Sequence, residues 1–185
     1  MVLAASCESL LTCALRPHLI WGPGDNHLIP RVIATARSGK LMQVGDGTNL
    51  VDITYVENGA KAHIQAEEAL KPESPVCGQA YFIGDQQPVN LWEWINELLQ
   101  SAEVPTVTKS ISYKKAKLAG AVLEFFYKIL PFKSEPRMTR FVAAQLAKSH
   151  YFSHAKAKEH FGYAPAIDNA EGLMRTIDWL KSQNF

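Results

Sequence analysis

The stretch "LRPHLIWGPGDNH", residues 15–27, joins the end of a buried-strand pattern to an abrupt stop. It continues the apolar run "LLTCALRP", residues 10–17, which has the length and composition of a strand buried on both faces of a parallel sheet. The Gly22-Pro23-Gly24 sequence then predicts a loop. A parallel strand that ends in such a loop is a place to expect a ligand.

After this strand, predicted strands and helices alternate along the chain, and the C-terminal part is predicted to contain helices only. We predict two short strands around the tight turn Gly45-Asp46-Gly47, which we interpret as a hairpin, and a further strand over 79–84. Helices are expected over about 30–38, 57–70, 91–100, 114–130, 136–147, 154–161 and 168–181, with Asn90 and Ser153 as N-caps and Gly162 as a stop.

Two helical faces are specific enough to predict burial. In the helix after Asn90 the buried face is expected to hold Leu91, Trp94, Ile95 and Leu98. In the helix over 57–70 the candidates for burial are Ala60, Ile64 and Ala69. The order of strand, helix, short strands, helix, strand and then helices only indicates an α/β sheet that merges into a mostly helical cap.

Composition excludes several classes of function. The net charge is +1 and 20% of residues are charged, without a block of one sign, which disfavours nucleic acid as a partner. Cys7, Cys13 and Cys77 form no CxxC pair and are expected as buried free thiols in the cytoplasm. We predict no metal site, because the one i,i+4 histidine pair, His150 and His154, has no accompanying carboxylate.

The most apolar later stretch, "AKLAGAVLEFFYKIL" at residues 116–130, is too short to span a bilayer. We interpret its apolar surface as core or as a lid over a substrate cleft, in preference to peripheral contact with a membrane surface. That surface consists of Leu118, Val122, Phe125, Phe126, Ile129 and Leu130.

Four segments resemble the C-terminal half of an extended short-chain dehydrogenase/reductase, in the order found in that superfamily. They are "CALRPHLIWGPGD" (13–25), "VGDGTNLVDITYVENGAKAHIQAEEAL" (44–70), "GQAYFIGDQQPVNLWEWINELL" (78–99) and "HYFSHAKAKEHFGYAP" (150–165). The nearest branch is the 3β-hydroxysteroid dehydrogenase and sterol-4-carboxylate 3-dehydrogenase group.

The resemblance implies an α/β fold, the C-terminal part of a Rossmann-like NAD(P)-binding fold with a mostly helical substrate-binding cap. Residues 1–38 would end the cofactor-binding sheet, and residues 39–185 would form the cap with one returning strand near 79–84. The cofactor would be NAD, with NADP as an alternative, and the nicotinamide wall would be formed by Pro17, His18, Leu19 and Ile20. Substrate contacts would come from Trp21, Asn26, Leu28 and Val51.

Catalytic residues are expected outside this chain. No Gly-rich strand-to-helix turn for a pyrophosphate occurs in the sequence, so the N-terminal half of the fold is expected to be absent. The family's catalytic Tyr-x-x-x-Lys would lie just upstream of Met1. The sequence contains the same spacing at Tyr113 and Lys117, which we interpret as a solvated basic helix start.

By resemblance the substrate would be a small hydrophobic alcohol or a sterol-like compound, oxidised at a 3β-hydroxyl, and the chain alone would be inactive. A sugar-nucleotide epimerase or dehydratase fragment is the alternative enzyme. It is disfavoured because valine occupies position 51, where those enzymes carry an arginine that grips the substrate diphosphate. A non-enzymatic NAD(P)-fold binding module is the third alternative. Expected partners are the missing N-terminal half and a second copy in a homodimer.

Overall fold

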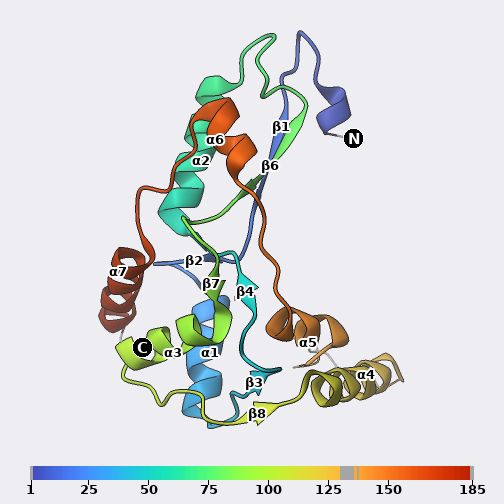
Figure 1. The fold of residues 1–185 in the computed structure, drawn as a ribbon, viewed down its shortest axis with the longest axis vertical. Helices are drawn as coiled ribbons and strands as arrows, with labels where there is room; N and C mark the ends of the chain where they lie inside the picture. Colours follow the sequence, from blue (N-terminus) through green and yellow to red (C-terminus); the bar gives the residue numbers. More distant parts are fainter. Residues whose placement is uncertain (1, 130–135, 137, 184–185) are drawn as a thin grey trace. The chain divides into compact units, whose positions relative to one another are not determined.

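A computed structural model describes residues 2–129, 136 and 138–183 (Figure 1). The chain forms two compact units and passes between them repeatedly. Unit 1 contains Met1–Leu28, Asp52–Pro88 and Tyr151–Phe185, and unit 2 contains Ile29–Val51 and Val89–His150.

Unit 1 is built on a parallel strand pair. Strand β1 (Cys13–Pro17) lies beside β6 (Gln79–Ile83), with Cys13 opposite Gln79 and Pro17 opposite Ile83. The predicted strand over 79–84 is confirmed. The strand predicted over 10–17 begins later, because a short 3₁₀ turn, η1 (Leu3–Ala5), is followed by an isolated antiparallel bridge between Cys7 and Leu10. Beyond β1, strand β2 (Ile20–Trp21) pairs in parallel with β5 (Thr54–Tyr55).

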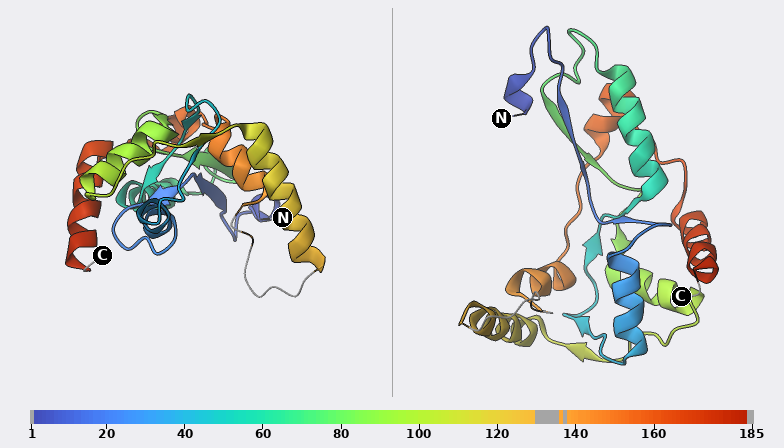
Figure 2. Two further views of the ribbon diagram at one scale, coloured as in Figure 1. Left: turned by 90° about the horizontal axis from the view of Figure 1, so that it is seen from below. Right: turned by 180° about the vertical axis from the view of Figure 1, so that it is seen from behind.

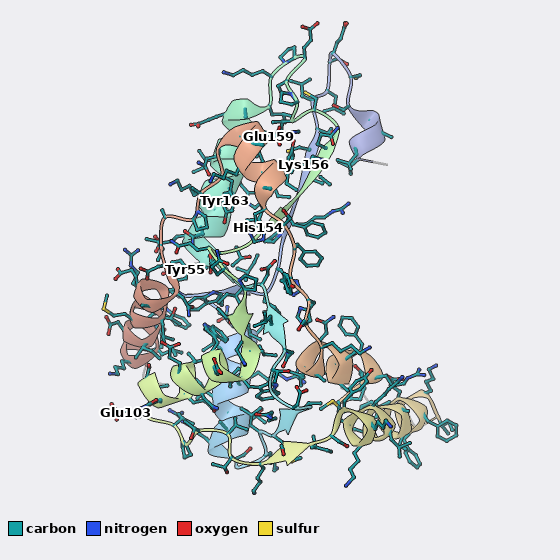
Figure 3. The ribbon with its side chains drawn as sticks, in the orientation of Figure 1. Tyr55, Glu103, His154, Lys156, Glu159 and Tyr163 are labelled. Carbon is teal, nitrogen blue, oxygen red and sulfur yellow. The ribbon has the colours of Figure 1, made fainter. Side chains whose placement is uncertain are left out.

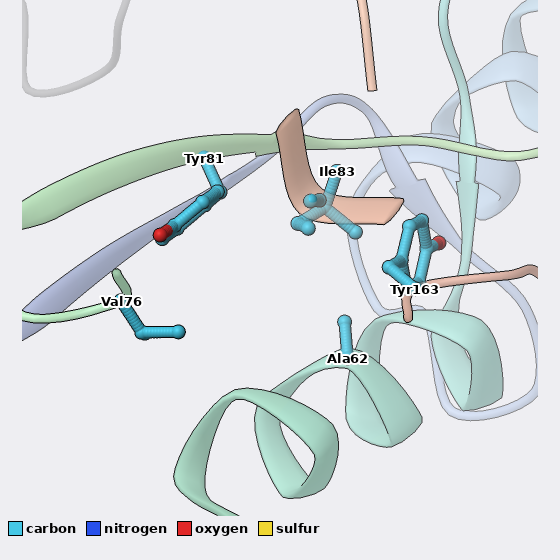
Figure 4. Packing of buried hydrophobic residues seen from close by; sticks show 6 residues of the cluster. Ala62, Val76, Tyr81, Ile83 and Tyr163 are labelled. Carbon is cyan, nitrogen blue, oxygen red and sulfur yellow. The ribbon is translucent and has the colours of Figure 1, made fainter. Parts of the chain in front are cut away.

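Two helices pack on the β1–β6 pair in a single hydrophobic cluster (Figure 4). They are α2 (Val56–Ala69) and α6 (Ala155–Phe161), which contribute Ala62 and Ala157. The strands contribute Tyr81 and Ile83. The small side chains Ala62 and Ala157 are almost completely buried in this cluster, as expected where a helix approaches a sheet closely.

The buried face of α2 differs from the prediction. Ala60 is exposed and Ile64 is 60% exposed, whereas Asn58, Ala62 and Ala66 are buried. The prediction was wrong for Ala60 and Ile64, whereas the third candidate, Ala69, is partly buried and packs against the hydrophobic cluster. The helix instead turns a polar and small face inward, where Asn58 makes hydrogen bonds that a solvent-facing position would not provide.

The predicted helix ends in unit 1 are confirmed, except for the residue at the N-cap of α6. Gly162 ends α6 in the left-handed conformation, with a φ of 67°, as predicted. Helix α7 (Asn169–Ser182) begins after Asp168, whose carboxylate accepts the Glu171 N–H. The N-cap position of α6 is occupied by His154 and not by Ser153, although the Ser153 hydroxyl still accepts the Ala155 N–H.

In unit 2 the predicted hairpin around Gly45-Asp46-Gly47 does not form. Strand β3 (Gln43–Val44) pairs in parallel with β8 (Ser110–Ile111), and β4 (Leu50–Val51) pairs antiparallel with β7 (Val89–Asn90). Gly45 and Gly47 do form a tight turn, with φ values of 88° and 82°. The turn was therefore predicted correctly, but the strands on its two sides separate because each pairs with a distant segment.

Helix α1 (Leu28–Arg37) and helix α3 (Leu91–Ser101) confirm their predictions. The Asn90 side chain accepts the N–H groups of Trp92 and Glu93 and so caps α3. The predicted face of α3 is buried throughout: Leu91, Trp94, Ile95 and Leu98.

Helices α4 (Tyr113–Ile129) and α5 (Arg140–Ala147) lie side by side in unit 2 (Figures 1 and 2). A Cβ added at Gly120 would lie 2.7 Å from the Arg140 backbone nitrogen, so the absence of a side chain there permits the contact. Among the described residues, no helix is long and apolar enough to cross a membrane.

The apolar surface predicted on α4 is not core in the described chain. Leu118, Val122, Phe125, Phe126 and Ile129 are each at least 46% exposed, and Leu130 lies outside the described residues. The lid interpretation stays a prediction. The cysteines are free, as predicted, but they are not buried: Cys13 and Cys77 are partly exposed, and Cys7 is exposed in a surface turn beside Ser9.

Candidate functional site

The candidate site lies in unit 1, where two parallel strands end in register. Because Pro17 is paired with Ile83, the carboxyl ends of β1 and β6 meet at one edge of the sheet. Thr54, fully buried, joins the two ends. Its hydroxyl oxygen is 2.9 Å from the His18 carbonyl oxygen and 3.1 Å from the Ile83 carbonyl oxygen, and it accepts the His18 N–H at 3.2 Å. We call these hydrogen bonds of the Thr54 hydroxyl the Thr54 clamp.

Leu19, the residue after His18, has an unusual backbone conformation. Its φ is +43°, in the left-handed region, which costs a residue with a Cβ about 1–2 kcal/mol. The Leu19 carbonyl accepts the Thr54 N–H at 3.2 Å, whereas the Leu19 amide takes no part in the Thr54 network. Strain that neighbouring hydrogen bonds maintain is typical of ligand-binding backbone.

The side chains of the predicted nicotinamide wall are accessible to different degrees. Pro17, His18 and Leu19 are half-buried, and Ile20 is 49% exposed. The His18 ring meets the ring of Phe152 edge-on at 5.6 Å. The wall therefore has an apolar surface around the Leu19 backbone.

The predicted substrate residues lie in three different environments. Trp21 is fully buried, with its ring edge-on to Tyr55 at 5.3 Å. Asn26 is exposed in the loop, and Leu28 opens α1, where its N–H donates to the Asp25 carboxylate. Val51 is fully buried in unit 2 and forms an isolated bridge with His150. Their assignment to a substrate cleft stays a prediction, while packing is the observed role of the Trp21 and Val51 side chains.

A buried polar network supports the strand ends, and the sequence interpretation missed it. The Asp85 carboxylate, just beyond β6, accepts the Tyr55 N–H at 2.9 Å and the Asn58 Nδ2 at 2.7 Å. Asn58 also donates to the Ile167 carbonyl and accepts the N–H groups of Ala166 and Ile167. One amide therefore joins α2 to the strand end and to the segment before α7.

A second part of the network is centred on Asp52. This buried carboxylate accepts the Phe152 N–H at 2.7 Å and lies 3.2 Å from the His154 Nε2. Tyr163 donates its hydroxyl to the Gly84 carbonyl at 2.8 Å (Figure 3). The feature of the sequence that could have predicted this network is the set of polar residues within the apolar stretch "VDITYVEN". Buried polar side chains need hydrogen-bond partners.

The Asp85 carboxyl makes the stability of unit 1 depend on pH. Burial raises the pKa of Asp85, and hydrogen bonds from Asn58 and Tyr55 oppose the increase in part. The folded state then holds the proton more tightly than the unfolded chain. The Asp85 contribution is therefore fully present below about pH 4 and is lost as the pH rises through the folded-state pKa.

We expect urea unfolding across pH to show the free energy of unfolding of the native chain falling, relative to Asp85→Asn, as the pH rises. Asp46→Asn is the control, because the Asp46 contribution to the free energy of unfolding changes with pH in the opposite direction. Hydrogen bonds from Thr48 lower the pKa of Asp46, so its contribution is lost as the pH falls. A difference between the native chain and Asp85→Asn that does not change with pH would contradict the prediction.

The Tyr-x-x-x-Lys spacing at Tyr113 and Lys117 lies in unit 2, at the start of α4. The Lys117 and Lys148 ammonium groups lie 6.0 Å and 5.4 Å from the centre of the Tyr113 ring, as in cation–π contacts. Among the described residues there is no cluster of three or more potential metal ligands.

Solved structures define the fold class. A dTDP-glucose 4,6-dehydratase from Streptomyces venezuelae, solved with NAD bound, matches 92% of this chain with a TM-score of 0.60 and 18% identity. The crystal structure of gox2253 matches 91% of this chain with a TM-score of 0.62 and 24% identity. The chain covers 44% and 48% of those two chains. The predicted α/β class with a Rossmann-like fold is thereby confirmed.

The family follows from the sequence itself. The chain belongs to the 3-beta hydroxysteroid dehydrogenase/isomerase family, whose sequence model matches residues 2–113. This confirms the resemblance on which the site prediction was based.

Curated relatives extend the match beyond residue 113. A 2-alkyl-3-oxoalkanoate reductase of Stenotrophomonas maltophilia is 48% identical over 94% of the chain. A 3beta-hydroxysteroid-dehydrogenase/decarboxylase (isoform 2) of Arabidopsis thaliana is 43% identical over 92%, and the decarboxylating sterol-4-alpha-carboxylate 3-dehydrogenase of Mus musculus is 34% identical over 92%. The chain spans 53%, 32% and 48% of the lengths of these relatives.

Proposed function

We propose that this chain supplies the nicotinamide wall and part of the substrate cap of an NAD-dependent oxidoreductase that acts on a carbon bearing a hydroxyl or oxo group. The left-handed Leu19 backbone, clamped by Thr54 at the strand end, is the observation that supports this role. We thereby propose for the whole protein the reductase or dehydrogenase activity that the names of its relatives describe.

The residues at the strand end suit a nicotinamide. The Leu19 amide, which the Thr54 network leaves unused, can donate to the carboxamide oxygen, and the half-buried Pro17 and exposed Ile20 can lie against the ring. When bound, NAD would accept or deliver a hydride. Thr54 would hold the backbone of His18 and Leu19 in place, so that little ordering is required on binding.

The names of the relatives support one class of substrate. A 2-alkyl-3-oxoalkanoate is a carboxylic acid with an oxo group on carbon 3 and a substituted carbon 2. A sterol 4-carboxylate likewise carries its carboxyl group beside carbon 3. We propose an apolar 3-hydroxy or 3-oxo acid with a substituted carbon between the two groups, of which sterols and alkyl acids are two subclasses. The higher identity to the reductase favours the alkyl acid.

We propose that the 185 residues alone have no turnover. The sequence lacks a Gly-rich pyrophosphate turn, and Tyr113 and Lys117 are occupied in cation–π contacts at a helix start in unit 2. A lysine that lies over the ring is not placed beside the phenol oxygen, where it would favour the tyrosinate.

The direct test is a chimera in which the upstream half of the Stenotrophomonas maltophilia reductase precedes this chain. We expect oxidation of NADH with a 2-alkyl-3-oxoalkanoate or reduction of NAD with a 3β-hydroxysterol 4-carboxylate, and no turnover by the chain alone. Turnover of a sugar nucleotide instead would favour the epimerase alternative. A folded chimera that binds no NAD would overturn the proposal.

In that chimera, Thr54→Val is expected to weaken NAD binding although Thr54 would not touch the cofactor. The substitution preserves shape but leaves the His18 carbonyl without its hydroxyl partner, which costs about 1–3 kcal/mol. Calorimetric NAD binding measures the effect. Thr48→Val is the matched control, because Thr48 is an exposed threonine that bonds only to Asp46. Equal affinities for NAD in both variants would contradict the role of the clamp.

A further inference from the structure

Three aromatic rings lie together at the end of the β1–β6 pair in unit 1. The Phe82 and Phe152 rings are stacked, with their centres 4.0 Å apart and an angle of 4° between their planes. The His18 ring meets Phe152 edge-on at 5.6 Å. Tyr81 and Ile83 face the cluster formed with α2 and α6, and side chains alternate along a strand, so Phe82 projects from the opposite face of the sheet. We call the rings of His18, Phe82 and Phe152 the aromatic group.

Phe152 reaches this position from a segment without regular structure. Residues 151–154 precede α6 and belong to no helix or strand. The buried Asp52 carboxylate holds them: its Oδ2 accepts the Phe152 N–H at 2.7 Å and lies 3.2 Å from the His154 Nε2. A Cβ added at Gly84 would lie 2.6 Å from the His154 Cε1, so the glycine leaves room for that ring. One carboxylate therefore contacts both Phe152 and His154.

His18 is contacted on both its backbone and its side chain. The Thr54 clamp holds the backbone, because the Thr54 hydroxyl lies within hydrogen-bond distance of the His18 N–H and carbonyl groups. The Phe152 ring lies against the His18 ring. Leu19, with its φ of +43°, follows directly. The position of His18 therefore determines where the left-handed Leu19 backbone starts.

We propose that Phe152 is a positioning residue for the nicotinamide wall. Its ring, which Asp52 anchors through the backbone, keeps His18 and the adjoining Leu19 backbone in the conformation that receives the cofactor. This inference rests on the proposed function, because it assigns a role at the same strand end. Phe152 acts by ordering the wall before the cofactor binds, and groups that are already ordered lose less conformational entropy on binding.

A purely structural role of Phe152 would have a different kinetic signature. The cost of ordering the wall applies to the bound substrates and to the transition state alike, so losing the prior order raises KM and leaves kcat unchanged. A loss of folded protein instead lowers the concentration of active enzyme. The apparent kcat then falls, while the KM of the remaining folded molecules stays the same.

The test is NADH oxidation by the chimera described above, with a 2-alkyl-3-oxoalkanoate as substrate. Phe152→Ala is expected to raise the KM for NADH roughly two- to tenfold, the range for one side chain that must be ordered on binding, with kcat nearly unchanged. Phe152→Tyr keeps the ring and is expected to restore the native KM. An unchanged KM for NADH in Phe152→Ala, in a chimera that binds NAD, would overturn this inference alone. A native chimera that binds no NAD would overturn the proposed function, and this inference with it.

Phe161→Ala is the matched control. It removes an aromatic ring from the other face of the same strand pair, where Phe161 lies edge-on to Tyr81 at 5.0 Å and packs against the hydrophobic cluster. We expect this variant to be less stable in urea but to keep the native KM for NADH. A KM raised equally in Phe161→Ala and Phe152→Ala would show a general effect of lost packing and would contradict the positioning role.

Two further measurements test the contacts themselves. If Asp52 acts through Phe152, the double variant Asp52→Ala/Phe152→Ala has the KM of Phe152→Ala alone, whereas increases that multiply would contradict the anchor. In the chimera without NAD, the NMR signals of the His18 ring protons are expected to shift in Phe152→Ala, because the ring current of Phe152 is lost, and to stay in place in Phe161→Ala. Unshifted His18 signals in Phe152→Ala would overturn the inference without any measurement of turnover.

Discussion

Replacing Trp21 with alanine is expected to lower the free energy of unfolding by about 3–5 kcal/mol. The indole is fully buried, lies edge-on to Tyr55, and meets α7 where Gly172 allows close approach. Truncation would leave a cavity between the strand end and α7. Each of these two segments is held by its own hydrogen bonds and would not move to fill the space. Urea unfolding followed by circular dichroism measures the loss without depending on the fluorescence of the removed residue.

The neighbouring residue is the control. Ile20 is 49% exposed, so Ile20→Ala is expected to cost less than about 1 kcal/mol of stability. In the chimera, Ile20→Ala would still weaken NAD binding if the residue forms the predicted wall. If Trp21→Ala lost substrate binding but no stability, the packing role described here would be contradicted and the predicted substrate contact supported.

Asn58→Ala is expected to lower the free energy of unfolding by about 3 kcal/mol or more. The amide donates to Asp85 and to the Ile167 carbonyl, and it accepts the N–H groups of Ala166 and Ile167. Alanine would leave these groups buried without their partner. Since the partners belong to segments far apart in the sequence, the loss would affect unit 1 as a whole.

Gln65→Ala provides a comparison on the same helix. Gln65 also carries an amide, but within the part of the chain that the structure describes this amide makes one hydrogen bond, at 3.4 Å to the Gly162 carbonyl. We expect a loss below about 1 kcal/mol in the same urea titration. Similar losses for Asn58→Ala and Gln65→Ala would show that the Asn58 network contributes little beyond the removal of an amide.

Features that depend on near neighbours in the chain were predictable from the sequence. The Asn90 cap, the buried face of α3 and the Gly162 stop were all predicted correctly. The Asn90 cap and the Gly162 stop depend on contacts within one turn of the residue, and the inward face of α3 follows from the helical spacing of its apolar residues. The Gly45-Asp46-Gly47 turn belongs to the same class, since its positive φ values follow from glycine itself.

Features that depend on distant segments were predicted less well. The hairpin was wrong because β3 and β4 pair with β8 and β7, which lie far along the chain. The outward position of Ile64 was missed because the inward face of α2 depends on segments far along the chain, where Asn58 finds its hydrogen-bond partners and Ala62 packs in the hydrophobic cluster. Thr54 and Asp85 were missed at the site for the same reason.

The sequence by itself determined the family and the place where β1 ends, because both follow from the order of residues along the chain, and the family resemblance then made the stretch from Pro17 to Ile20 a candidate cofactor wall. Only the tertiary structure decided that Thr54 clamps the backbone beside Leu19, that Trp21 is packed inside unit 1, and that large apolar side chains of α4 are exposed. The role of a buried polar side chain or of an apolar helix face depends on which other segments the folded chain places against it.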